Sequence, residues 1–239
     1  MAWAVEPKIS AASIDVMVSS EGESLRHTRQ IAQYRLGPVW RFADTLGYTR
    51  PMSKAFSTLA LRPELLLGVE EAGYVEMTAI QEEGLPPMLE GRDVIGQAKT
   101  GSGKTAAFGL ALLNTIETRD LTPQALVLCP TRELADQVSE ELRRLAKRMS
   151  NTRIVTLCGG RPYRNQALAL EHGNHVIVGT PGRILKHLDK GNLRLADLSV
   201  VVLDEADRMM DMGFIDQVSD ILRWAPPKRQ TLLFSATFP

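Results

Sequence analysis

The chain has 239 residues, of which 44% are hydrophobic and 23% are charged, with 28 basic and 28 acidic residues. This composition is typical of a globular protein with one large core, and no stretch reaches the roughly eighteen apolar residues of a membrane span. The N-terminus lacks a compact apolar run before a small-residue cleavage site, which predicts a cytoplasmic protein that does not contact membranes. The zero net charge excludes a strongly basic nucleic-acid-binding domain and predicts weak affinity for nucleic acids.

The first fifty residues differ from the rest of the chain. Small and polar residues dominate the first half of this segment, and Leu25–Leu46 has the pattern of a short amphipathic helix interrupted at Gly37-Pro38. We predict that residues 1–51 form a poorly ordered N-terminal extension. Two explanations stay open: translation starts naturally at Met52 and the extension is an artefact of start-site choice, or the extension is a genuine part of the protein.

A phosphate-binding loop is predicted after the first clear strand. Asp93–Gln97 has the pattern of a strand, Ala98–Thr105 is rich in glycine, and Ala106–Ile116 is a strong helix-forming run. The glycines would let backbone N–H groups surround the phosphates of ATP, Lys104 would reach the β- and γ-phosphates, and the Thr105 hydroxyl would bind Mg²⁺. We expect Lys104 to face solvent, so that Lys104→Ala abolishes ATP binding with little loss of fold.

Two cysteines follow predicted strands later in the chain, and neither is expected to react. Cys129 and Cys158 lie near strand ends, where we predict reduced and packed thiols. His172 and His175 flank a predicted turn without a nearby cysteine or carboxylate pattern, which favours solvated histidines over a metal site.

A pair of carboxylates follows a buried strand near the C-terminus. Val200–Leu203 is a short β-branched run, and Asp204-Glu205-Ala206-Asp207 comes directly after it. A strand that ends in two acids presents them at the carboxyl edge of a sheet, where open α/β folds bind ligands. One carboxylate can then hold Mg²⁺ while its neighbour orients or deprotonates the attacking water. Taken alone, the tetrapeptide is equally consistent with an acidic surface turn.

Three more polar turns each follow a predicted strand. Taken singly, each is explained by local structure, since Thr131 suits a helix N-cap and Pro181 suits a first helical turn. Helices and strands alternate from residue 56 onward, which predicts a doubly wound, mostly parallel sheet with helices on both faces. The carboxyl ends of such strands share one edge, so the turns would gather there. The turns are Pro130–Ala135 after Ala125–Cys129, Thr180–Arg183 after His175–Gly179, and Ser235–Thr237 after Thr231–Phe234.

In combination, these motifs make the chain from Phe56 to Pro239 resemble the DEAD-box RNA helicases, and the bacterial DbpA subfamily in particular. The resemblance implies a Q-motif region at residues 52–82 and a RecA-like P-loop domain at residues 83–239. It also implies ATP and Mg²⁺ as cofactors, RNA as a partner, and RNA-stimulated ATP hydrolysis. DbpA-like enzymes act in assembly of the large ribosomal subunit, so the resemblance further implies ribosomal RNA as the target.

The resemblance assigns a role to each motif residue. Gln81 would read the edge of adenine, Phe56 would stack on the base, and Asp207 would connect the ATP side to the RNA side. The implied catalytic residues are Lys104, Asp204, Glu205, Asp207, Ser235 and Thr237, and the implied Mg²⁺ ligands are Thr105 and Asp204. The implied ATP-binding residues are Phe56, Gln81, Ala98, Thr100, Gly101, Ser102, Gly103, Lys104 and Thr105. The implied RNA-binding residues are Pro130, Thr131, Arg132, Gly159, Gly160, Thr180, Gly182 and Arg183.

Helicases of this family need two RecA-like domains, and the second one supplies arginines to the ATP site. Because the sequence ends at Pro239, we expect the second RecA-like domain and the C-terminal RNA-recognition domain to be absent. We therefore expect weak or no activity until a second domain is supplied in cis or in trans. Two alternatives remain: a non-catalytic module that binds nucleotide and RNA, and a RecA-like ATPase directed by DNA.

Overall fold

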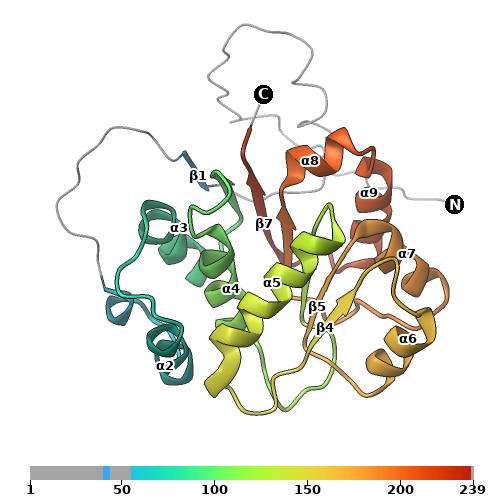
Figure 1. Cartoon of the computed structure of the whole chain (residues 1–239), viewed down its shortest axis with the longest axis horizontal. Helices are drawn as coiled ribbons and strands as arrows, with labels where there is room; N and C mark the ends of the chain where they lie inside the picture. The colour runs from blue at the N-terminus through green and yellow to red at the C-terminus, as the bar shows by residue number, and fades with distance from the viewer. Residues whose placement is uncertain (1–39, 44–54, 238–239) are drawn as a thin grey trace, which may run out of the picture.

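The computed structural model of the chain describes residues 40–43 and 55–237. Within them, seven strands form one sheet in the order β1-β2-β7-β6-β3-β5-β4, and every neighbouring pair is parallel (Figure 1). The predicted doubly wound sheet is confirmed, with every strand parallel. The strands are β1 (Trp40–Ala43), β2 (Val94–Gln97), β3 (Ala125–Leu128), β4 (Ile154–Leu157), β5 (Val176–Gly179), β6 (Val200–Asp204) and β7 (Gln230–Ser235).

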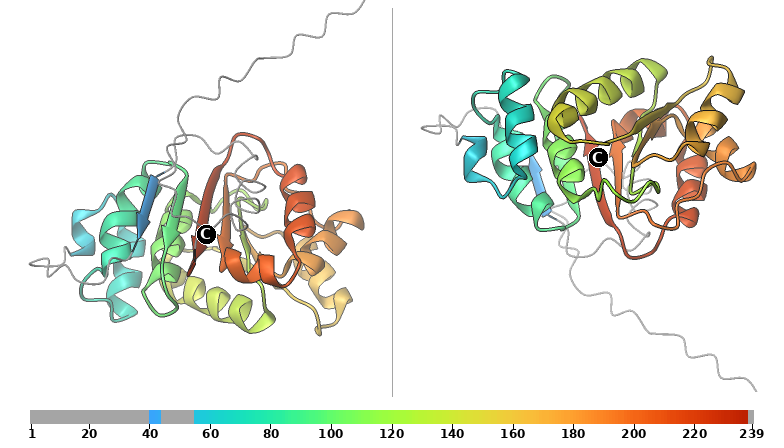
Figure 2. Two further views of the ribbon diagram at one scale, coloured as in Figure 1. Left: turned by 90° about the horizontal axis from the view of Figure 1, so that it is seen from above. Right: turned by 90° about the horizontal axis from the view of Figure 1, so that it is seen from below.

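Helices connect the strands and surround the sheet in both views of Figure 2. None of the helices that the structure describes is both long and apolar enough to cross a membrane. Two short 3₁₀ helices, η1 (Phe56–Thr58) and η2 (Ala146–Arg148), accompany the α-helices. The α-helices are α2 (Pro63–Glu71), α3 (Ala79–Leu89), α4 (Lys104–Thr115), α5 (Arg132–Leu145), α6 (Tyr163–Glu171), α7 (Pro181–Asp189), α8 (Ala206–Asp211) and α9 (Ile215–Trp224).

The two faces of the sheet bury separate hydrophobic cores. Successive side chains of a strand point to opposite faces, so one strand contributes to both cores. In β3, Val127 belongs to the core that contains residues of α2 to α5. Its neighbours Leu126 and Leu128 belong to the core formed with α7, α8 and α9. The central strands β3 and β5 are apolar and buried along their whole length because both faces of the sheet are covered by helices.

Strand β1 lies where the sequence predicted part of a helix. Residues 40–43 were expected within an amphipathic helix over Leu25–Leu46, but they form a strand that pairs with β2 in the register Trp40↔Val94 to Ala43↔Gln97. The rest of the predicted extension, residues 1–51, and the predicted initiator Met52 lie outside the described residues. Four residues are too few for their hydropathy pattern to distinguish a strand from a helix.

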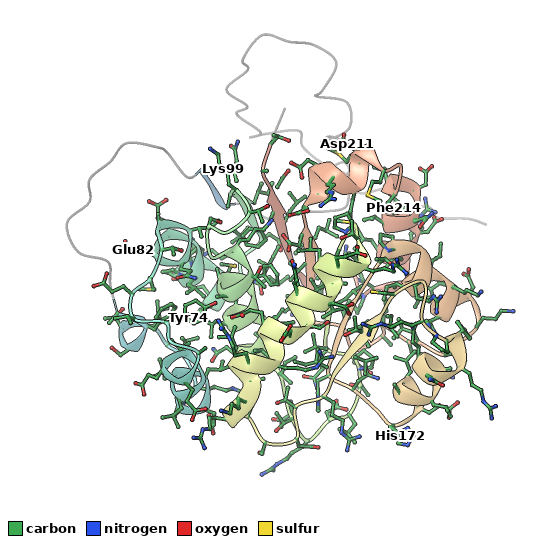
Figure 3. All side chains as sticks on the ribbon, viewed as in Figure 1. Tyr74, Glu82, Lys99, His172, Asp211 and Phe214 are labelled. Carbon is green, nitrogen blue, oxygen red and sulfur yellow. The ribbon has the colours of Figure 1, made fainter. Side chains whose placement is uncertain are left out.

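The strand order divides the carboxyl edge of the sheet into two halves. The half formed by β2, β7 and β6 carries the glycine-rich loop, the turn after Ser235 and the Asp204-Glu205 pair. The half formed by β3, β5 and β4 carries the turns that begin at Pro130, Thr180 and Cys158. Lys99 and Asp211 mark this edge of the molecule in Figure 3, whereas His172 lies at the opposite end.

Both cysteines are buried and free, as predicted. Burial raises the pKa of the Cys129 thiol well above its usual value and that of the Cys158 thiol to about 11. Both groups therefore stay in the unreactive thiol form at neutral pH.

Candidate functional site

The glycine-rich loop runs from the end of β2 to the first turn of α4. Gly101 and Gly103 have φ angles of 84° and 92°, a left-handed conformation that glycine adopts at little cost. Gly103 is also the N-cap of α4. A Cβ at Gly103 would lie 2.6 Å from Gln81 Nε2 and 2.9 Å from Thr78 Oγ1. Both the backbone conformation and the packing therefore require glycine at this position.

Both polar atoms of the Gln81 amide have a hydrogen-bond partner within the protein. Its Oε1 accepts a hydrogen bond from the backbone N–H of Thr78 at 2.9 Å, and its Nε2 donates to the carbonyl of Gly103 at 3.0 Å. The side chain is 0% exposed. Gln81 therefore joins the Q-motif region to the glycine-rich loop, and its amide can still offer a second N–H and a second lone pair to adenine.

Phe56, the expected base-stacking residue, lies in the core. The side chain is 4% exposed, and its ring packs against Tyr74 with a centroid separation of 6.0 Å. Stacking of Phe56 on a base stays a prediction.

Lys104 and the acids after β6 form a buried cluster. Lys104 Nζ lies 2.9 Å from Asp204 Oδ1 and 3.6 Å from Glu205 Oε1. Lys104 is 4% exposed and Asp204 is 0% exposed. The expectation that Lys104 faces solvent is therefore wrong. The hydrogen-bonded pairing of β2, β7 and β6 brings the loop against the acids, and this contact cannot be read from either segment alone.

Several polar atoms of this cluster lack a good hydrogen bond. Among the described residues, Lys104 Nζ, both carboxylate oxygens of Asp204 and Ser102 Oγ have no hydrogen-bond partner of good geometry. Burial raises the pKa of Asp204, and the neighbouring Lys104 opposes this shift. Buried polar groups normally find partners, so these atoms fit a site built for a charged ligand.

The donor set fits a magnesium–phosphate ligand better than a metal held by protein alone. The described residues contain no group of three or more His, Cys, Asp or Glu side chains that could hold a metal ion. Mg²⁺ usually keeps several waters and binds through one or two carboxylates plus substrate phosphates. Asp204 and the Thr105 hydroxyl at the start of α4 suit that mode of binding.

Glu205 has an unusual backbone and three side-chain partners. Its φ of 56° places it in the left-handed region, which a non-glycine residue rarely adopts. Besides its contact with Lys104, its Oε1 accepts from Thr100 Oγ1 at 3.3 Å and its Oε2 pairs with Arg208 at 3.2 Å. These partners fix the carboxylate. Arg208 was not among the expected site residues, although its position three residues after Glu205, at the start of a helix, was a signal for this pair.

Asp207, in the first turn of α8, connects this helix to the turn after β7. Its Oδ2 accepts hydrogen bonds from the backbone N–H of Ala236 at 3.1 Å, the N–H of Thr237 at 2.9 Å and Thr237 Oγ1 at 2.8 Å. Ser235 Oγ donates to the carbonyl of Thr237 at 2.6 Å. Burial acts to raise the pKa of Asp207, but the hydrogen bonds from Thr237 and from the Arg208 N–H outweigh it and hold the pKa below its usual value. Asp207 is thus bonded to Thr237, whereas the Ser235 hydroxyl donates its hydrogen bond to the Thr237 carbonyl.

We expect Asp207→Asn to destabilise the chain by about 2 kcal/mol at pH 7, because charge-assisted hydrogen bonds contribute about 1.5–3 kcal/mol. The pKa of Asp207 is lower in the folded chain, so its stabilisation is complete above the unfolded pKa and is lost as the pH falls through the folded pKa. Urea unfolding of parent and variant at pH 7 and pH 3 measures both effects. Asp211→Asn, an exposed acid at the end of α8, is the control and should change neither. Equal stabilities of parent and Asp207→Asn at pH 7 would contradict the assignment.

The turns after β3, β4 and β5 converge on the other half of the edge. Thr131 is the N-cap of α5, and its Oγ1 accepts from the Leu134 N–H at 3.2 Å. The Arg132 guanidinium reaches the turn after β4, where a Cβ on Gly160 would lie 1.9 Å from Nη1. Arg183 Nη1 donates to the carbonyl of Arg161 at 3.2 Å. The structure thus brings together the hydroxyl, guanidinium and glycine-rich groups expected to contact RNA.

A matched pair of glycines tests this surface. Gly160 has a φ of 74° and lies against Arg132, whereas Gly191, in the turn after α7, has a φ of 71° and a Cβ there would meet nothing within 4 Å. We expect Gly160→Ala to displace Arg132 and to weaken RNA binding by about ten-fold, because about 1.4 kcal/mol of strain or lost contact corresponds to that factor. Gly191→Ala, outside the expected RNA surface, should stay within about two-fold of the parent. Fluorescence anisotropy with a labelled single-stranded RNA measures both, and equal effects of the two variants would refute the expectation.

The comparisons with known proteins give the family. A family model for DEAD/DEAH box helicases matches residues 78–239. The chain belongs to the DEAD/DEAH box helicase family. It is 59% identical over 186 residues to the ATP-dependent RNA helicase DbpA of Escherichia coli, a match that covers 77% of this chain and 41% of the relative. The chain therefore spans less than half the length of that DEAD-box relative.

Solved DEAD-box structures share the fold. The DEAD box protein from Methanococcus jannaschii is 39% identical with a TM-score of 0.74, covering 77% of this chain and 50% of that one. A Dbp5 variant from S. cerevisiae bound to RNA and ADP BeF3 is 37% identical with a TM-score of 0.72, covering 78% of this chain and 47% of that one. The predicted RecA-like architecture and the predicted family are thereby confirmed.

Proposed function

We propose that this chain is the ATP- and RNA-binding N-terminal half of a DEAD-box RNA helicase. In this proposal, residues 52–82 form the Q-motif region, and residues 83–239 form the first RecA-like domain. ATP hydrolysis is coupled to remodelling of RNA duplexes when a second RecA-like domain is joined in cis or in trans. The observation that carries the proposal is the buried contact of Lys104 Nζ with Asp204 and Glu205, at 2.9 and 3.6 Å.

The residues on the ATP half of the edge have the following proposed roles. Lys104 binds the β- and γ-phosphates together with the backbone N–H groups of the glycine-rich loop, and Thr105 and Asp204 hold Mg²⁺. Mg²⁺ supplies positive charge that offsets the charge of the phosphates. Glu205, fixed by Thr100 and Arg208, orients the attacking water. Asp207, which is bonded to the turn after β7, couples this half to the RNA half.

The RNA half of the edge offers contacts to the sugar–phosphate backbone. Its hydroxyl, guanidinium and backbone N–H groups suit phosphate and 2′-OH recognition, which is independent of base sequence. Membership in the DEAD-box family supports RNA as the partner. A ribosomal RNA target, a role in assembly of the large ribosomal subunit and a cytoplasmic location rest on the resemblance to the bacterial DbpA subfamily.

The test is ATP hydrolysis by this chain alone, with structured ribosomal RNA, and with DNA of the same length. Turnover that rises with RNA and not with DNA supports the proposal. Binding of ATP without turnover, even when a second RecA-like domain is added in trans, would favour the non-catalytic module instead. Equal stimulation by DNA and RNA would favour a DNA-directed ATPase, and failure to bind ATP at all would overturn the site assignment.

A further inference from the structure

A buried glutamine on α6 connects two of the loops that are proposed to bind RNA. Gln166 is 6% exposed. Its Nε2 donates to the carbonyl of Cys158 at 2.8 Å, directly before the Gly159-Gly160 turn. Its Oε1 accepts from Arg183 Nη1 at 3.2 Å and lies 3.2 Å from His187 Nε2. One amide therefore contacts the turn after β4 and two residues of α7.

Besides Gln166, other neighbours of Arg183 also restrict its guanidinium group. Its Nη1 is shared between Gln166 Oε1 and the carbonyl of Arg161, both at 3.2 Å. The guanidinium carbon lies 5.8 Å from the centroid of the Tyr163 ring, which stacks on His187 at 4.3 Å and 7°. Within the described part of the chain, the other guanidinium nitrogens of Arg183 make no hydrogen bond. They can donate to a phosphate while Nη1 stays bound to the protein.

His187 favours the same orientation of the amide. The side chain is 0% exposed, and burial, together with Arg183 and Lys186, lowers the pKa of His187 to about 4. The ring is therefore neutral near pH 7, and its Nε2 can donate to Gln166 Oε1. The amide nitrogen of Gln166 is consequently directed to the Cys158 carbonyl.

We propose that Gln166 is a positioning residue for RNA binding, which holds the Arg183 guanidinium and the Gly159-Gly160 turn in one fixed arrangement so that adjacent phosphates of one strand meet both. The inference rests on the proposed function. A preorganised guanidinium loses less side-chain entropy on binding, so fixing it raises affinity without a direct contact between Gln166 and RNA.

The test is a double-mutant cycle between Gln166→Met and Arg183→Ala, read out by binding of a labelled single-stranded uridine decamer at several salt concentrations. Gln166→Met is expected to raise Kd about five-fold, the effect of losing one hydrogen bond of about 1 kcal/mol. Arg183→Ala should lower the slope of log K against log salt by about 0.7, the value for one phosphate contact to a single strand. In the Arg183→Ala background, Gln166→Met should have a smaller effect, because only its contact with the Gly159-Gly160 turn is then lost. Gln137→Met, the same change at an exposed position of α5, is the control and should leave Kd unchanged.

Gln166→Glu separates positioning from general stability. It keeps an acceptor for Arg183 but loses the donor to Cys158, so it should bind RNA with the parent's salt slope even if it melts at a lower temperature. This variant also decides the question if Gln166→Met does not fold, because a reduced slope in Gln166→Glu would overturn the inference. Equal effects of Gln166→Met with and without Arg183 would also overturn it. A parent chain that binds no RNA overturns both this inference and the proposed RNA function, whereas a binding parent with an unaffected Gln166→Met overturns this inference alone.

Discussion

Replacing Lys104 by alanine is expected to destabilise the fold as well as to abolish nucleotide binding. The substitution removes the cation that lies 2.9 Å from Asp204 Oδ1, in a site where Asp204 is 0% exposed. Breaking a buried ion pair by deleting one partner costs about 3–5 kcal/mol, because the remaining charge is left without compensation. Burial already raises the pKa of Asp204, so protonation of the lone carboxyl should make the loss smaller at acidic pH.

The double variant Lys104→Ala/Asp204→Asn separates the two effects. Removing the uncompensated charge should restore most of the lost stability, whereas binding of a fluorescent ATP analogue should not return. Urea unfolding at pH 7 gives the stability of each variant, and titration with the analogue gives its affinity. A Lys104→Ala chain as stable as the parent would show that the buried pair contributes nothing, and ATP binding equal to that of the parent would refute the phosphate-binding loop.

Glu205→Gln is expected to leave ATP binding within a few-fold of the parent and to reduce hydrolysis by about 10²–10⁴-fold, the usual contribution of a general base. Glutamine keeps the size of the side chain and can still accept a hydrogen bond from Thr100, but it cannot accept a proton from water. Phosphate release in a single turnover measures the effect, with the protein in excess of ATP and a second RecA-like domain supplied in trans.

Glu140→Gln provides the matched control for that experiment, because Glu140 is exposed on α5 and far along the chain from the acids after β6. It should hydrolyse ATP at the rate of the parent. Hydrolysis by Glu205→Gln at the parent's rate would assign the base elsewhere, and a loss of ATP binding by this variant would assign Glu205 a role in binding.

Local features of the candidate site could be predicted from the sequence because they depend on neighbouring residues. The left-handed turns of Gly101 and Gly103 require glycine at those positions, and β-branched runs such as Val200–Val202 predict buried strands. The motifs that follow the strands had to share one edge, since parallel strands end at the same side of a sheet. The fold class, the family and the position of the Asp207 link were therefore accessible from sequence.

Only the tertiary structure decided burial and side-chain partners, because these depend on segments that are distant in sequence. Lys104 is buried since the sheet order brings the loop after β2 next to the acids after β6, about a hundred residues away. Gln81 is bound to Gly103, and Gln166 to Cys158 and Arg183, through contacts that no periodicity encodes. The sequence by itself determined which elements form and which chemistry ends each strand. The strand order, set by how the two cores pack against the sheet, decided which of those ends meet.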